Sequence, residues 1–220
     1  MPERPDPTLR VLLVAAEAVG GIARHVRALA DGLPQHGVEV TVCAPPSTLA
    51  AIELVSSDRI VAAPIGRLSP VRLRTARRTL AGLVAGVDLV HAHGLRAGAT
   101  VAAAAPSAPL VVTWHNAPLL RGPARLGQNA LARYVARSAD LTLAASDDLA
   151  DWARRCGGIA VHSTFVAAPA LDPPHRTRTA VRADLGVGQR PLVLAVARLH
   201  PQKRLDVLID AAATWQGPDQ

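Results

Sequence analysis

The amino-acid sequence predicts an α/β fold, namely a doubly wound parallel sheet followed by the incomplete start of a second domain of the same class. In residues 1–168, short apolar segments alternate about seven times with segments of helical spacing, which is typical of strands and helices in a parallel sheet. Residues 169–190 contain several prolines and arginines and predict a linker. Residues 191–220 then begin another strand–helix unit.

The first unit covers residues 10–43. Residues 10–16 form a short apolar run, as expected for a buried strand, and Gly20 and Gly21 follow it. Apolar residues at positions 22, 26, 29, 30 and 33 share one helical face, and the alternation of valines at 38, 40 and 42 predicts a second strand. A strand–helix–strand unit of this kind predicts parallel pairing.

The later elements follow in the same alternation. Residues 47–55 predict a weak helix, and Ser146 is suited to cap the last helix of the first domain. In the segment 122–139, we expect Leu126, Ala130, Leu131, Tyr134 and Val135 to be buried. The remaining predicted strands are 59–65, 87–93, 110–115, 140–145, 159–166 and 193–196, and the remaining helices are 70–85, 96–105, 122–139, 146–155 and the segment from 205.

Composition and charge narrow the class of protein. The chain has 220 residues, half of them apolar, and a formal net charge of +7, with Lys203 as its one lysine. A basic surface favours anionic partners such as nucleotides, phosphosugars or anionic lipids. Aromatic residues are only 2%, which disfavours nucleic acid because few side chains can stack on bases. Two cysteines without metal-ligand spacing and a polar N-terminus predict a cytoplasmic protein.

In a doubly wound sheet, ligands bind beyond the carboxyl ends of the strands, so residues after each strand are candidates. Gly20 and Gly21 precede a helix, and there the backbone can approach a phosphate closely, although a simple tight turn is the alternative. The G-x-G-x-x-G spacing is absent and no acidic residue follows the second strand, which disfavours an NAD enzyme. Neither a G-x-S-x-G elbow nor a Walker loop is present.

Histidines lie at the ends of the fourth and fifth predicted strands, 87–93 and 110–115. His91 and His93 share one strand face, so a metal site is conceivable, but a polar contact or a packing role is favoured because no Cys or carboxylate cluster accompanies them. His115 comes at a strand tip, where it could contact substrate or exchange a proton, or be a satisfied loop histidine.

The segment 70–85 carries four arginines on the face opposite its apolar stripe. Such a face is usually solvated, and its alternative is contact with an anionic membrane or an acidic acceptor. The four are Arg72, Arg74, Arg77 and Arg78. The segment 193–215 also pairs a basic turn with a helix start, a design suited to binding phosphate.

Taken together, these segments resemble the retaining family 4 glycosyltransferases of the GT-B fold, which has two Rossmann-like domains. The matching stretches occur in the family's order and are GGIARHVRALADGLPQHGVEVTVCAP, VDLVHAHGLRAG, VVTWHNAP, SADLTLAASDDLADW and VARLHPQKRLDVLIDAA. The resemblance implies that residues 1–168 hold the acceptor and that the second domain binds a nucleotide-sugar. It also implies transfer with retention, without a protein nucleophile, metal or other cofactor.

The resemblance also implies roles for particular residues. Arg198 and Lys203 match the pair that binds the donor diphosphate, and Gly20 and Gly21 match the loop that faces it. His115 matches the histidine beside the transferred sugar, and is the expected catalytic residue. His93 and Asn116 match weaker acceptor-side positions.

Four departures from the family pattern accompany the match. Ala197 and Arg204 stand where the family commonly has glycine. The family's Glu-x7-Glu element is absent from the 220 residues, so the donor cannot be identified. Residues 165–169 replace a common Asn-Gly-Val-Asp segment.

Three functions are compatible with these features. The first is a hexosyl transfer from a nucleotide-sugar to an acceptor that is lipid-linked or phosphorylated, with peripheral contact at the inner face of the membrane. We expect residues 1–220 alone to have little activity, because half of the donor site would be missing. The alternatives are a nucleotide-sugar 2-epimerase of the same fold and a non-catalytic domain that binds sugar or lipid.

Overall fold

The computed structural model forms two compact units, residues 1–170 and 171–220. The structure describes residues 9–53, 59–66, 69–116, 122–164, 166, 173–197 and 199–215.

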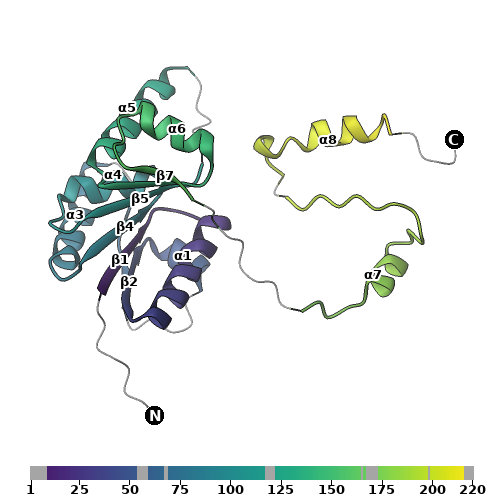
Figure 1. The fold of residues 1–220 in the computed structure, drawn as a ribbon, viewed down its shortest axis with the longest axis horizontal. Coiled ribbons are helices and arrows are strands. Elements are labelled where there is room, and N and C mark those ends of the chain that lie inside the picture. Colours follow the sequence, from purple (N-terminus) through teal and green to yellow (C-terminus); the bar gives the residue numbers. More distant parts are fainter. Residues whose placement is uncertain are drawn as a thin grey trace, which may run out of the picture. The chain divides into compact units, whose positions relative to one another are not determined.

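A parallel sheet of seven strands forms the centre of the first unit (Figure 1), in the order β3-β2-β1-β4-β5-β6-β7. The doubly wound α/β class that the sequence predicts is therefore confirmed. The order reverses between β1 and β4, and in such sheets this switch point is where ligands bind. The strands are β1 Leu9–Ala15, β2 Val38–Ala44, β3 Ile60–Ala62, β4 Leu89–His93, β5 Leu110–Trp114, β6 Leu141–Ala144 and β7 Val161–Ser163.

The helices cover the sheet from both sides and create two apolar cores. The smaller core packs β1 and β2 against α1 and α2, and includes Leu13, Val26 and Ile52. The larger core lies on the other face, beneath α3 to α6, and includes Leu12, Leu80 and Trp114 (Figure 1). The helices of this unit are α1 Gly21–Gly32, a 3-10 turn Leu33–His36, α2 Pro46–Ile52, α3 Pro70–Val84, α4 Leu95–Ala104, α5 Pro123–Ser138 and α6 Asp147–Arg155.

The predicted buried face of α5 is only partly right. Val135 is buried as predicted, and Leu131 is half-buried against the larger core. Leu126 is 74% exposed and Tyr134 is 44% exposed, and Ala130 is exposed as well. The helix buries Ala132 and Ala136 beside Val135. Close packing explains the difference, because a Cβ added to Gly98 of α4 would lie 2.9 Å from Cγ1 of Val135. Small residues on α5 permit this approach, so they take the buried face in place of Leu126 and Tyr134.

Ser146 occupies the predicted cap position before α6, but its side chain does not cap the helix backbone. Its hydroxyl donates a hydrogen bond to the Asp148 carboxylate instead. Within the part of the chain that the structure describes, no helix is long and apolar enough to cross a membrane.

The described residues of the second unit contain three short helical segments. They are α7 Arg178–Asp184, a 3-10 turn Pro201–Lys203 and α8 Leu205–Ala212. The helix predicted from residue 205 is therefore present, whereas α7 lies in a stretch where the sequence predicted no regular structure. The Thr177 hydroxyl accepts from the backbone of Ala180 and so caps α7, a local signal that apolar periodicity does not report.

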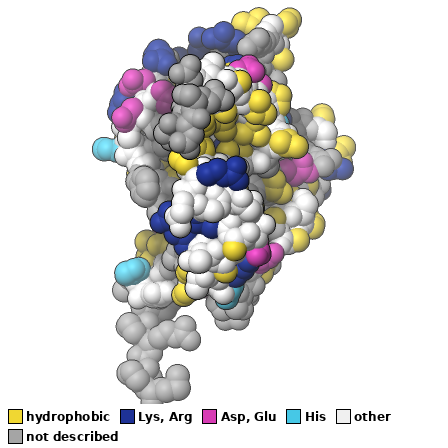
Figure 2. Space-filling model, turned by 90° about the vertical axis from the view of Figure 1, so that its right-hand side faces the viewer, with side chains coloured by type: hydrophobic (Ala, Val, Ile, Leu, Met, Phe, Trp, Pro, Cys, Tyr) yellow, Lys and Arg dark blue, Asp and Glu magenta, His cyan; other side chains and the backbone are white. Residues whose placement is uncertain are grey.

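The strand predicted at 193–196 is not present. A strand needs a neighbour for its backbone groups, and the described residues of this unit contain no other strand. Val196 is accordingly 88% exposed, and none of the described side chains of the second unit is buried. Figure 2 shows hydrophobic side chains, in yellow, exposed beside basic and acidic ones on one face of the molecule. Arg204 adopts a left-handed conformation with φ 45°, which glycine would adopt without strain.

Candidate active site

The loop between β1 and α1 leaves the start of a helix accessible at the carboxyl edge of the sheet. Gly20 has φ 68° and α1 begins at Gly21 without a side chain that caps it. A Cβ added to either glycine would have nothing within 4 Å, so the space beside this backbone is open. Backbone N–H groups of a first helical turn that lack intrahelical acceptors form a site for anions.

A threonine of α2 holds this loop. The backbone N–H of Ala18 donates to the Oγ1 atom of Thr48 at 3.0 Å, and the Thr48 hydroxyl donates to the carbonyl of Ala16 at 3.1 Å. Thr48 is buried, so the contact is protected from water. The β1–α1 loop is thus fixed from a neighbouring element, which the sequence motifs do not indicate.

Four histidines meet beside the switch point. His91 and His93 lie on β4, His115 follows β5, and His25 comes from the second turn of α1. The Nδ1 atom of His93 is 3.3 Å from the Nε2 atom of His115, and the ring of His25 is 5.5 Å from both of these rings. His91 bonds through Nε2 to the Thr113 hydroxyl at 2.7 Å. The sheet register produces this cluster by placing His93 opposite Thr113.

Burial keeps these imidazoles neutral. It lowers the pKa of His91 to about 4, with the nearby His25 and His115 as smaller causes, and it lowers the pKa of His115 to about 4, with His25 as a smaller cause. Burial also lowers the pKa of His93 well below its usual range, and that of His25. At neutral pH, the cluster therefore offers neutral donors and acceptors to a ligand. No described group of three or more His, Cys, Asp or Glu side chains has the geometry to hold a metal.

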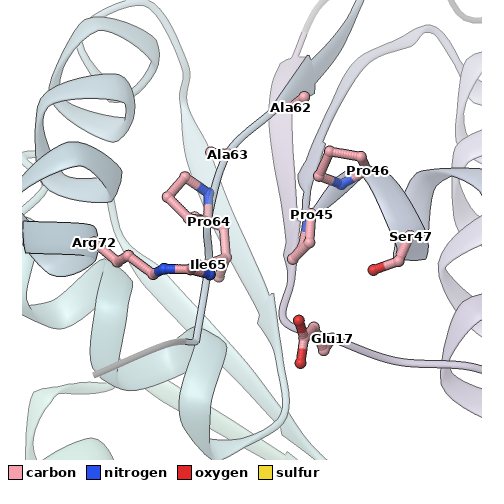
Figure 3. Close-up of a pocket in the computed structure, with 9 residues that line it drawn as sticks. All are labelled: Glu17, Pro45, Pro46, Ser47, Ala62, Ala63, Pro64, Ile65 and Arg72. Atoms are coloured by element: carbon pink, nitrogen blue, oxygen red, sulfur yellow. The ribbon is translucent and has the colours of Figure 1, made fainter. Parts of the chain in front are cut away.

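A pocket of about 500 Å³ opens at the same edge, beyond the ends of β1, β2 and β3. Its polar groups are the Glu17 carboxylate, the Ser47 hydroxyl and the Arg72 guanidinium, and prolines, alanines and Ile65 form the rest of its wall. Figure 3 shows Arg72 extending from α3 towards the gap, with Glu17 and Ser47 on the opposite side. The pocket therefore combines apolar walls with a cation, an anion and a hydroxyl, which suits a hydroxylated ring.

The four arginines of α3 divide between two surfaces. All four are exposed, but Arg72 lines the pocket at the strand ends. Arg74, Arg77 and Arg78 instead line a second groove of about 460 Å³, together with Leu73, Ala81 and Ala104. The predicted arginine face is thus partly a wall of the candidate site and partly a basic groove between α3 and the end of α4.

The structure brings some predicted site residues together and leaves others apart or undescribed. Gly20, Gly21, His93 and His115 lie at one edge of the first unit. Asn116 follows His115 and is exposed. Lys203 is exposed at the end of the 3-10 turn of the second unit, and Arg198 lies outside the described residues.

Sequence reasoning missed the contribution of His25 and the link between His91 and Thr113. His25 lies four residues after Gly21 on a helix, and its side chain was not distinguishable from a surface histidine without the placement of α1 on the sheet. A helical position one turn beyond a glycine-rich helix start is the one signal that would have indicated it.

Several solved structures are similar in fold to this chain. HepE of Anabaena in complex with UDP matches with a TM-score of 0.71 and 18% sequence identity, covering 94% of this chain and 58% of HepE. The HepE complex with UDP-glucose matches with a TM-score of 0.69 and the same identity and coverage. UDP-N-acetylglucosamine 2-epimerase of Rickettsia bellii matches with a TM-score of 0.55 and 10% sequence identity, covering 71% of this chain and 44% of the epimerase.

These identities are low, so the matches show a common fold. The chain spans 58% of the length of HepE. No curated protein matches its sequence. The family description Glycosyltransferase Family 4, however, matches residues 19–174. That match covers more than half of the 220 residues, and the chain therefore belongs to glycosyltransferase family 4.

Proposed function

We propose that residues 1–168 are the acceptor-side domain of a glycosyltransferase that moves a hexosyl group from a nucleotide-sugar to an acceptor hydroxyl with retention. The observation that carries this proposal is the juxtaposition of an open helix start at Gly20 and Gly21 with the neutral histidines around His115, in a chain of family 4. HepE, which has the same fold, is described in complex with UDP and with UDP-glucose.

In the proposed reaction, the acceptor oxygen forms a bond to the anomeric carbon as the bond from that carbon to the diphosphate oxygen breaks. The acceptor proton passes to the departing diphosphate. Because charge develops on the diphosphate, fixed donors and cations that face it lower the barrier. The backbone at Gly20 and Gly21 is the proposed donor from the first unit, and Arg198 and Lys203 are the proposed cations from the second. No resident metal or other cofactor enters this proposal.

The remaining site residues take positions around the sugars. His115 is proposed to contact the transferred sugar, and His93 and Asn116 to lie on the acceptor side. The pocket with Glu17 and Arg72 is the proposed acceptor site, because its carboxylate can accept from hydroxyl groups and its guanidinium can bind a phosphate. A phosphorylated or lipid-linked acceptor suits this pair of charges.

We also propose peripheral contact with an anionic membrane at the cytoplasmic face. Arg74, Arg77 and Arg78 line one groove together with the apolar Leu73. Such a basic surface would attract anionic lipid headgroups.

The proposed donor site is incomplete in the second unit. Its described residues have neither a sheet nor a buried side chain, so no pocket for a base or sugar is built there. We therefore expect the 220-residue chain to be weak or inactive as a transferase, and to gain activity when a complete donor domain of a family member replaces the residues after 190.

The test supplies this chimera and the unmodified chain with UDP-glucose, other nucleotide-sugars and a set of phosphorylated and lipid-linked acceptors, and follows the sugar by NMR. Transfer to an acceptor with the donor's anomeric configuration is the expected result. Inversion would contradict retention. A sugar isomerised at carbon 2 without transfer would favour the epimerase alternative, and saturable binding of sugar or lipid without any conversion would favour a binding domain.

A further inference from the structure

A fully buried histidine contacts the proposed catalytic histidine. His93 is only 2% exposed, and its Nδ1 atom lies 3.3 Å from the Nε2 atom of His115. The two residues belong to neighbouring strands, where His93 pairs in register with Thr113. The contact is therefore built into the sheet, and it connects a rigid core position to a half-buried residue at the strand tip.

A hydrogen bond between two neutral imidazoles contains one hydrogen, and it can belong to either ring. If His115 donates, the second nitrogen of His93, Nε2, must carry a hydrogen. If His93 donates from Nδ1, its Nε2 atom has a bare lone pair. The Nε2 atom of His93 is buried and has no hydrogen-bond partner among the residues that the structure describes.

The two arrangements differ in the group that is buried at Nε2 of His93, which is an unpaired N–H in the first and a bare lone pair in the second. A buried N–H group without an acceptor is rare in proteins, whereas the other arrangement leaves no buried donor unpaired. The arrangement in which His93 donates to His115 is therefore favoured. His115 must then carry its own hydrogen on Nδ1.

The surroundings disfavour a second proton on this pair. His25 of α1 faces both rings at 5.5 Å, and the ring of His91 lies 4.2 Å from that of His93. The His91 side chain is itself engaged with the Thr113 hydroxyl. These neighbours supply no carboxylate that would stabilise an imidazolium, so the pair remains neutral and shares a single hydrogen between its facing nitrogens.

We propose that His93 is a positioning residue, which donates its Nδ1 hydrogen to His115 and so fixes His115 as the Nδ1–H tautomer. The Nε2 lone pair of His115 is then occupied. His115 meets a ligand through an N–H donor, and it does not act as a base through Nε2. This inference rests on the proposed function for the role of His115, but the tautomer itself is a property of the chain without substrate.

The test is the imidazole ¹⁵N spectrum of the 220-residue chain at neutral pH, in which a bare ring nitrogen and an N–H nitrogen resonate far apart. Signals are assigned with His115→Gln and His93→Asn. The expected wild-type result is a protonated Nδ1 and a bare Nε2 on both His93 and His115. A His115 that is protonated on Nε2 would overturn the proposal without any further variant.

Two substitutions separate positioning from packing. His93→Leu has similar volume but removes the donor, so His115 is expected to lose its tautomer preference and to show both forms. His93→Asn retains an amide donor near the position of Nδ1 and is expected to keep the Nδ1–H form. His91→Gln serves as a neighbouring control that should leave His115 unchanged. An unchanged His115 spectrum in folded His93→Leu would contradict the proposal.

The spectrum does not require turnover, so the two claims can fail separately. If the tautomer is as expected and no glycosyl transfer occurs, only the proposed function is wrong. If transfer occurs and His115 is protonated on Nε2, only the positioning role is wrong. In an active chimera, His93→Leu should lower transfer by about 10- to 100-fold, by analogy with the loss when a partner that orients a metal-bound histidine is removed. His93→Asn should recover most of this loss.

Discussion

The hydroxyl of Thr48 lies 3.0 Å from the backbone nitrogen of Ala18, 30 residues away in the chain. The same hydroxyl donates to the carbonyl of Ala16. One buried side chain of α2 therefore satisfies two backbone groups of the segment that leads to Gly20. The segment that leads to the proposed phosphate site is therefore held in place by α2, which packs with α1 in the smaller core.

Replacing Thr48 should lower stability through hydrogen bonding and not through volume. Thr48→Val keeps the shape but leaves two backbone groups unpaired in a buried place, which should cost about 1–3 kcal/mol in the free energy of unfolding. Thr48→Ser keeps the hydroxyl and should cost clearly less. Urea unfolding of the whole chain measures both, and equal losses in the two variants would show that the hydrogen bonds contribute nothing.

Two glycines in neighbouring helices should respond to alanine in opposite directions. A Cβ at Gly98 would meet Val135 at 2.9 Å and Val112 at 3.0 Å, so Gly98→Ala should lower stability by about 1–3 kcal/mol through overpacking. A Cβ at Gly82 of α3 would meet nothing within 4 Å, and Gly82→Ala should raise stability by up to about 1 kcal/mol through helix propensity. Thermal unfolding distinguishes them, and a stabilising Gly98→Ala would refute the close packing of α4 on α5.

The histidine cluster should make the first unit sensitive to acid. The pKa of His91 is about 4 in the folded chain and about 6.5 when unfolded, so its contribution to stability is complete above the unfolded pKa and falls as the pH drops towards 4. One pKa unit corresponds to about 1.4 kcal/mol. Between pH 7.5 and pH 5, the free energy of unfolding should therefore fall by about 1–2 kcal/mol less in His91→Gln than in the wild type.

The exposed His36→Gln variant is the matched control for this comparison, since His36 lies outside the cluster. Its free energy of unfolding in urea should change between pH 7.5 and pH 5 by the same amount as that of the wild type. If His91→Gln and His36→Gln behave alike, the cluster is not the source of the acid sensitivity.

The basic groove on α3 should bind anionic vesicles in a manner that depends on these particular arginines. Each arginine near an anionic surface contributes about 1 kcal/mol, so Arg77→Glu with Arg78→Glu should weaken binding to phosphatidylserine vesicles by about 30-fold or more. Binding should also weaken steeply with salt. Co-sedimentation at two ionic strengths measures both effects.

A charge-matched control combines Arg133→Glu on α5 with Arg155→Glu on α6. This pair changes the net charge of the chain by the same amount as the α3 pair. This pair should reduce vesicle binding much less than the α3 pair. Equal losses would attribute binding to the overall charge of +7 rather than to the groove. Comparable binding to neutral vesicles would contradict an electrostatic role.

The sheet and most of its helices were predictable because their apolar residues follow the periods of buried strands and helices. Gly20 and Gly21 could also be placed, since they follow β1 directly. The buried face of α5 was only partly predictable. Leu126 satisfies helical spacing as well as Val135 does, and only the approach of Gly98 to Val135 decides which of them is buried. A pairwise contact of this kind leaves no periodic mark in the sequence.

The histidine cluster was only half predictable. His93 and His115 each follow the pattern of a strand-end residue, so their nearness to the site could be expected. Their hydrogen bond depends on the register between β4 and β5, and the approach of His25 depends on where α1 lies on the sheet. In the second unit, the apolar run at 193–196 has the pattern of a strand. It forms none, because a strand also needs a neighbouring strand to pair with.

The most direct test of the central claim is a titration of ¹⁵N-labelled chain with UDP, followed at the backbone amides and the imidazole nitrogens. If the β1–α1 loop is the phosphate site, the amides of Gly20 and Gly21 and the ring of His115 should shift together and saturate, even if affinity is only millimolar. Shifts confined to other regions, or none at UDP concentrations about tenfold above a millimolar dissociation constant, would contradict the assignment of this edge as the nucleotide-sugar face.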